Sequence, residues 1–113
     1  MANYTVIKDT REKVLLFFPK FDLCNGIILR KLDTGDYSIE GHEHRVAVER
    51  KGSVSELSQN LLEDRFYREL ERMKAIPHRF LLLEFTYNDI LIFPRNSGIP
   101  QYKWPEIKIK PDF

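Results

Sequence analysis

The chain has 113 residues, 42% hydrophobic and 31% charged, which is enough for one hydrophobic core, so we expect a single domain over residues 1–113. No run approaches the roughly 20 apolar residues of a membrane span, and the N-terminus lacks the features of a secretory signal. Cys24 is the only cysteine, which excludes an internal disulfide and a thiolate zinc site. We therefore expect a soluble intracellular protein, cytoplasmic or, in a eukaryote, nuclear. The net charge of +1 neither indicates nor excludes a nucleic-acid partner.

The first elements carry charge directly behind apolar chain. β-Branched and aromatic residues at 4–7 predict a strand that delivers the charged residues 8–12 at its carboxyl end. The apolar residues 14–18 stop before Pro19 and suit either a short helix or a core strand.

Two turn signals organise the next segment. The Asn-Gly pair at 25–26 predicts a turn into a strand over 27–32. A second turn at 33–36 leads into extended chain at 37–39. Residues 45–51 alternate between apolar and polar and then become wholly charged, which is typical of a strand that ends in a site.

Helical spacing governs the middle of the chain. Residues 53–56 have the Ser-x-x-Glu form of a capping box, and the apolar spacing behind it predicts helix over 53–74 with a break near 63–64. The nearly continuous apolar run 79–85 predicts a strand covered on both faces. Strand, helix and strand over 45–86 should form a right-handed crossover.

The last part of the chain predicts little regular structure. Asn88 and Asp89 suit the cap of a short helix through Phe93, and four prolines in the segment 94–113 prevent long elements.

The charged end of the strand over 45–51 indicates phosphodiester chemistry. Side chains alternate faces along a strand, so Glu49 and Lys51 project together while Arg50 points away. Mg²⁺ binds oxygen ligands, polarises a phosphate and activates a water molecule that a lysine can orient. Such a site needs a second acid, and Asp36 follows Gly35, whose backbone can approach the sheet and aim the carboxylate inward.

Acids at the end of the first strand would complete a site for one or two metals. Asp9 and Glu12 meet that requirement if their strand neighbours the one that carries Glu49.

The longer pattern resembles the nuclease domain of the XPF family of structure-specific endonucleases, in the restriction-endonuclease-like superfamily. Its motifs in order are Asp9-Thr10-Arg11-Glu12, Gly35-Asp36-Tyr37-Ser38-Ile39, Val48-Glu49-Arg50-Lys51 and Asp64-Arg65-Phe66, within a core of residues 4–86. The resemblance implies an α/β fold with a central mixed β-sheet flanked by α-helices. It also implies an Mg²⁺- or Mn²⁺-dependent endonuclease, a hydrolase that cuts flap, fork or junction DNA in repair or recombination.

The resemblance assigns roles by position. The expected catalytic side chains are Asp9, Glu12, Asp36, Glu49 and Lys51. Among them Asp36, Glu49 and Asp9 are the expected metal ligands, and Lys51 is the expected water-orienting cation. Arg11, Arg50 and Arg65 are the expected DNA-binding residues. The resemblance further implies a homodimer, for which we expect the apolar elements after Tyr87 to form the contact; no membrane or nucleotide cofactor is expected.

Two departures from the family stand out. The family usually has an Asp where this chain has Ser55, so Glu56 either substitutes for it or only caps the helix. The tandem helix-hairpin-helix region is also missing, which suits a compact member of bacterial or phage origin or a fragment that ends before another module.

Alternatives remain open beside the nuclease. The first is a catalytically inactive nuclease-like subunit for DNA binding or dimerisation, and the second is an unrelated α/β domain whose charge run is coincidental. The segment 42–44, His-Glu-His, suits an exposed loop better than a metal site. The charges interleaved over 63–74 suit pairing on a helix surface. Trp104, among lysines, suits packing on the domain better than stacking on a base.

Overall fold

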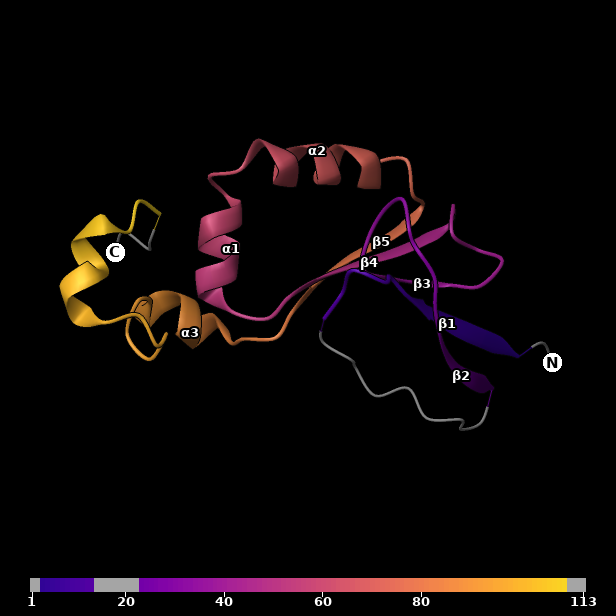
Figure 1. Cartoon of the computed structure of the whole chain (residues 1–113), viewed down its shortest axis with the longest axis horizontal. Coiled ribbons are helices and arrows are strands. Elements are labelled where there is room, and N and C mark those ends of the chain that lie inside the picture. Colours follow the sequence, from indigo (N-terminus) through magenta and orange to yellow (C-terminus); the bar gives the residue numbers. More distant parts are fainter. Residues whose placement is uncertain (1–2, 14–22, 110–113) are drawn as a thin grey trace. The chain divides into compact units, whose positions relative to one another are not determined.

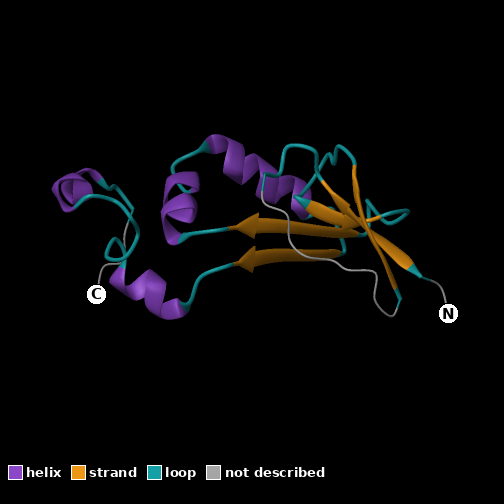
Figure 2. Ribbon diagram, turned by 60° about the horizontal axis from the view of Figure 1, so that its bottom comes forward, coloured by secondary structure: helices purple, strands orange, loops and turns teal. Residues whose placement is uncertain are grey.

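The structure, a computed structural model, describes residues 3–13 and 23–109. The chain divides into two compact units, Met1–Glu49 with Glu69–Leu81 and Arg50–Arg68 with Leu82–Phe113. Figure 1 and Figure 2 show the elements along the chain. The strands are β1 Tyr4–Lys8, β2 Cys24–Leu29, β3 Tyr37–Ile39, β4 Val46–Lys51 and β5 His78–Leu83. The helices are α1 Val54–Asn60, α2 Asp64–Met73 and α3 Tyr87–Ile92, with a 3₁₀ helix η1 Gln101–Glu106.

The five described strands form one mixed sheet in the order β2-β1-β3-β4-β5. β1 pairs with β2 in parallel, and β3 pairs antiparallel with both β1 and β4. The Arg45 carbonyl accepts from His78 N at 2.9 Å and the Lys51 carbonyl accepts from Glu84 N at 3.0 Å. Equal spacing on both chains is the parallel pattern, so β5 runs parallel to β4. The expected α/β class, with a mixed sheet and helices, is confirmed.

Among the described strands, β3 alone runs opposite to the others. β3 therefore begins at the edge of the sheet where β1 and β4 end. This topology brings the segment before Tyr37 next to the segment after Lys8. The strand ends that carry the predicted acids consequently meet at one edge.

A small apolar core lies in the first unit. Val6, Cys24 and Tyr37 are buried together, and Ile27 and Val48 pack against them. Cys24 is a free thiol and packs in this core as a small buried side chain.

The predicted turn at 25–26 is wrong, because these residues lie inside β2. The register with β1 moves from Tyr4↔Cys24 to Val6↔Ile27, which adds one residue on the β2 side. Gly26 there has φ +106°, a conformation that a residue with Cβ rarely adopts. The Asn-Gly pair thus makes a β-bulge in a paired strand. β2 also ends at Leu29 and not at Leu32.

The predicted helical segment and its break are confirmed. Ser53 is the N-cap of α1 and its hydroxyl accepts from Glu56 N at 3.0 Å. α1 and α2 are separated by residues 61–63, and α2 ends before Pro77. α3 begins two residues earlier than expected, because Thr86 is its N-cap and Asp89 completes the capping box. None of the described helices is long and apolar enough to cross a membrane.

The expectation that β5 is covered on both faces is wrong. Every residue of β5 is exposed, and Phe80 is 57% exposed. Apolar composition therefore does not mark burial in this strand. The segment 14–18, predicted as a short helix or a core strand, lies outside the described residues.

Candidate functional site

Backbone hydrogen bonds hold Asp36 between two strand ends of the first unit. Its carbonyl accepts from Asp9 N at 2.8 Å, and its N–H donates to the Val48 carbonyl at 2.7 Å. Val48 directly precedes Glu49. The three predicted metal-ligand residues, Asp9, Asp36 and Glu49, are therefore neighbours along the sheet edge, although they lie far apart in the sequence.

Gly35 permits this approach. Its φ is +82°, and a Cβ built on it would lie 3.2 Å from the Val48 carbonyl oxygen and 3.3 Å from the Ala47 Cβ. A side chain at this position would meet both a strained backbone and a crowded β4. The expectation that Gly35 lets the chain approach the sheet before Asp36 is confirmed.

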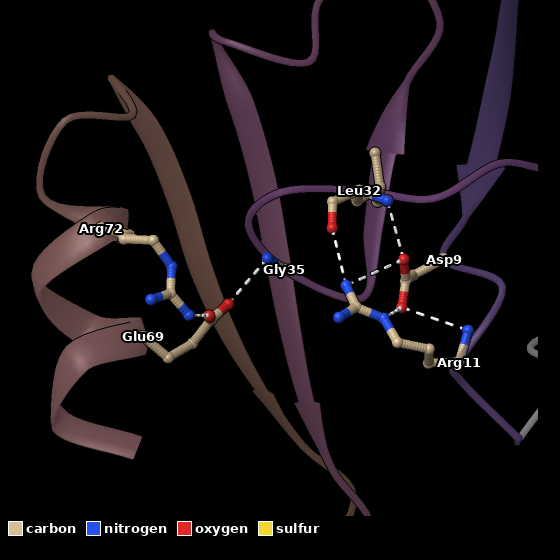
Figure 3. A network of polar contacts seen from close by, with 6 residues as sticks. All are labelled: Asp9, Arg11, Leu32, Gly35, Glu69 and Arg72. Carbon is tan, nitrogen blue, oxygen red and sulfur yellow. Dashed lines mark hydrogen bonds and ion pairs between the residues drawn. The ribbon is translucent and has the colours of Figure 1, made fainter. Parts of the chain in front are cut away.

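Asp9 organises the chain that follows β1. Its Oδ2 accepts from Arg11 N at 3.2 Å and from Arg11 Nε at 2.9 Å, and its Oδ1 accepts from Leu32 N at 2.7 Å. Arg11 also donates from Nη2 to the Leu32 carbonyl at 2.8 Å. The Asp9 carbonyl accepts from Glu12 N at 3.1 Å, which closes a turn. Figure 3 shows this cluster of Asp9, Arg11 and Leu32.

Electrostatics favour the ionised pair. Burial raises the pKa of Asp9. The hydrogen bonds from Arg11 and Leu32 and the charge of Arg11 lower it by more than burial raises it, so the pKa lies below its ordinary value. The hydrogen bond to Asp9 and the negative charge of Asp9 raise the pKa of Arg11. The charges of Glu69 and Asp36 raise it a little more. The Arg11 guanidinium thus lies in the field of three carboxylates.

A second polar contact reaches the same turn from helix α2. Glu69 Oε1 accepts from Gly35 N at 2.8 Å, and its Oε2 accepts from Arg72 Nη2. Figure 3 shows Glu69 between Gly35 and Arg72. The interpretation of Glu69 as one of the charges paired along the helix is confirmed by its ion pair with Arg72, but its hydrogen bond to Gly35 was not foreseen. The missed signal is its spacing, since Glu69 lies three residues after buried Phe66 and four before buried Met73.

Glu49 and Lys51 occupy one face of β4. Buried residues alternate with half-buried ones along this strand, and Glu49 and Lys51 are 9% and 6% exposed. In the second unit, Lys51 Nζ lies 4.9 Å from the centroid of the Phe66 ring, a cation–π contact. The predicted alternation of β4 is confirmed. Sequence reasoning did not foresee the aromatic partner of Lys51.

The predicted DNA-binding arginines all have acidic partners. Arg11 bonds to Asp9, Arg50 Nε pairs with Glu84, and Arg65 Nη2 lies 3.2 Å from Glu63 Oε2. Arg11 and Arg65 are exposed, whereas the side chain of Arg50 is nearly buried. Their contact with DNA stays a prediction, and Arg50 is the least accessible of the three.

The donor chemistry fits a divalent metal through two acids. Within residues 3–13 and 23–109, no group of three His, Cys, Asp or Glu side chains is arranged to hold a metal ion. Both Asp9 oxygens accept hydrogen bonds, so Asp9 braces the site in this arrangement. Mg²⁺ is commonly bound by one or two carboxylates together with water and substrate phosphate. Asp36 and Glu49 are carboxylates of the kind that could form such a pair, and their role as metal ligands stays a prediction.

Other features singled out in the sequence make local hydrogen bonds. The carboxylate of Glu56 accepts from Gly52 N at 2.9 Å, one residue before the N-cap Ser53, so Glu56 bonds the chain at the start of α1, and its alternative role as a substitute for the family Asp stays open. Residues 42–44 form a loop in which Glu43 accepts from Gly41 N at 2.8 Å, a bond that lowers the pKa of Glu43. Trp104 Nε1 donates to the Ile99 carbonyl at 3.0 Å, a local contact, and the packing of Trp104 on the domain stays a prediction.

Comparison with known proteins gives one match. Searches of curated proteins and of solved structures give no match. The model of the ERCC4 domain matches residues 9–110, which include the candidate acids, the lysine and both units. This domain is the XPF-type nuclease domain, from a nuclease family that acts on branched DNA in repair. With its strand-end acids and its mixed sheet, the chain belongs to the ERCC4 domain family.

Proposed function

We propose that this protein is an active endonuclease that hydrolyses phosphodiester bonds in flap, fork or junction DNA with Mg²⁺ or Mn²⁺. The observation that carries the proposal is the pair of backbone hydrogen bonds at Asp36, to Asp9 N and to the Val48 carbonyl. They bring separate acidic segments to one sheet edge, which is what metal-assisted phosphate chemistry requires. The two units would act as one nuclease domain.

Each candidate residue has a stated role. Asp36 and Glu49 would hold the metal, which supplies Lewis-acid activation of the scissile phosphate and of a water molecule. Asp9 and Arg11 bond to each other and to Leu32, and so hold the turn after β1 beside the loop that precedes Asp36. Glu12 would contribute a further carboxylate beside them.

Lys51 would stabilise charge that develops on the phosphate. Burial keeps an ammonium group away from bulk water, which strengthens its interaction with a nearby anion. The ring of Phe66 accommodates the cation in the free protein. DNA contacts from Arg11 and Arg65 would position the duplex.

Cleavage of flap, fork and plain duplex DNA in Mg²⁺ tests the proposal. We expect wild-type protein to cut branched DNA faster than duplex, and Asp36→Asn and Lys51→Ala to lower kcat at least about a hundredfold. Asp33→Asn, which changes an exposed acid in the same turn, is the matched control and should cut normally. Cutting at the wild-type rate by Asp36→Asn contradicts the proposal.

The alternative is an inactive nuclease-like subunit that binds DNA or dimerises. Its distinguishing result is wild-type protein that binds branched DNA but does not cut it in Mg²⁺ or Mn²⁺. Retention of acids and a lysine at one sheet edge favours the active enzyme, because a subunit that only binds DNA has no chemical need for them.

We also propose a homodimer and an intracellular location. Two separate segments carry exposed apolar side chains to which a second copy of the chain could bind: β5, and α3 with Tyr87 and Leu91. The proposed substrate, DNA, is found in the cytoplasm of a bacterium or in the nucleus of a eukaryote, which supports the intracellular location.

A further inference from the structure

Glu69 makes a polar contact that the nuclease motifs do not include. Its side chain is 17% exposed, and it bonds through Oε1 to Gly35 N at 2.8 Å and through Oε2 to Arg72. Both bonds lie in the first unit and appear in Figure 3. A carboxylate that accepts a backbone N–H is a strong acceptor, because its charge assists the bond.

The amide that Glu69 holds belongs to the residue before Asp36. Gly35 has φ +82°, and a Cβ added to it would lie within 3.3 Å of Ala47 and Val48 atoms in β4. Glycine has the widest conformational freedom of any residue, so this turn needs an external contact to keep one conformation. The contact with Glu69 supplies it from a separate element.

Asp36, the next residue, connects this turn to the ends of β1 and β4 through its backbone hydrogen bonds. Asp36 donates its N–H to the Val48 carbonyl and accepts from Asp9 N. The conformation at Gly35 therefore fixes the backbone from which the Asp36 carboxylate projects.

We propose that Glu69 is a positioning residue, which holds Gly35 and thereby aims the Asp36 carboxylate at the metal. Arg72 orients the Glu69 carboxylate for this purpose. The inference rests on the proposed function for its catalytic consequence, but the backbone effect does not depend on any activity.

Amide hydrogen exchange of the metal-free protein tests the backbone effect. We expect Glu69→Ala to speed exchange at Gly35 and Asp36 about tenfold, because the Gly35 N–H loses its acceptor. Glu69→Gln keeps an amide oxygen as acceptor and should retain most of the protection. Unchanged exchange at both amides in Glu69→Ala overturns the proposal, whether or not the protein cuts DNA.

Steady-state cleavage of branched DNA in Mg²⁺ tests the catalytic effect. Loss of a residue that orients a metal ligand typically lowers activity about 10- to 100-fold, so Glu69→Ala should lower kcat by that factor with KM unchanged. Glu69→Gln should recover activity to within about threefold of wild type. Equal kcat in wild type and Glu69→Ala overturns the proposal. Inactive wild-type protein refutes the proposed function, while the exchange result still decides the role of Glu69.

The helix itself offers a matched control. Glu71 lies two residues away, is exposed and pairs only along the helix, with Lys74 Nζ at 2.8 Å. Glu71→Ala should leave both exchange and kcat unchanged. If Glu69→Ala does not fold, Arg72→Ala removes the partner of the carboxylate; faster exchange at Gly35 then supports the proposal and unchanged exchange overturns it.

Discussion

The polar strand ends and the apolar strand β5 invert the usual distribution of side chains. Asp9, Glu49 and Lys51 are buried, whereas Phe80 and its neighbours on β5 are exposed. Buried charge persists only where partners compensate for lost hydration, as Arg11 and Leu32 do for Asp9. The exposed apolar surface of β5 is where we propose that a second copy of the chain binds. Bonding partners, more than composition, therefore decide which side chains are buried in these strands.

Removal of the buried Asp9 carboxylate should give the largest loss of stability among the changes considered. We expect Asp9→Ala to lower the free energy of unfolding by about 3 kcal/mol, because the Leu32 N–H and the Arg11 guanidinium lose their acceptor together. Urea denaturation measures the loss. Asp9→Asn keeps one oxygen for the Leu32 N–H and should lose roughly half as much. A change within about 0.5 kcal/mol in Asp9→Ala would show that the cluster contributes nothing to stability.

A charge on β5 should weaken association through its exposed apolar side chains. We expect Phe80→Lys to weaken self-association at least about tenfold and to change monomer stability by at most about 0.5 kcal/mol, since the side chain is exposed. Sedimentation velocity measures the association.

The matched variant is Leu91→Lys on α3, the segment that sequence analysis favoured for the contact. If Leu91→Lys weakens association and Phe80→Lys does not, the dimer forms through α3. A wild-type chain that is monomeric at all concentrations contradicts the dimer proposal.

The smallest effect should come from acid. Asp9 has a lowered pKa in the folded state, so its contribution to stability is present above the ordinary carboxyl pKa of about 4 and is lost as pH falls through the lower folded value. Because Arg11 is exposed and solvent screens its charge, we expect at most about 1 kcal/mol. Urea denaturation of wild type and Asp9→Asn at pH 6 and below pH 4 measures it. Identical pH dependence in both proteins would refute this assignment.

Local chemistry explains what the sequence predicted well. Strand alternation located Glu49 and Lys51 on one face of β4, and the need for φ above zero located Gly35 in its turn. The Ser53 cap and the break between α1 and α2 depend on neighbours within a few residues. Such features follow from short-range patterns and need no knowledge of the fold.

Features that depend on distant partners were missed. The Asn-Gly pair became a bulge because pairing of β2 with β1 overrides local turn preference. Exposure of β5 depends on what covers the strand, which its composition does not encode. The role of Glu69 depends on a residue 34 positions away, Gly35, and its helical spacing gave only the face it occupies. The expected metal-ligand role of Asp9 stays a prediction, whereas its hydrogen bond from the Leu32 N–H was not foreseen.

The hairpin formed by β3 and β4 has a candidate site residue at one end and a connecting loop at the other. Asp36 lies at one end, whereas the connection over 40–45 lies at the other. Gly41 in that connection has φ +84°, so it should stay glycine, whereas its neighbours His42 and His44 are exposed. An engineer who wants to attach a fluorophore or an affinity handle thus has an entry point at the other end of the hairpin from Asp36.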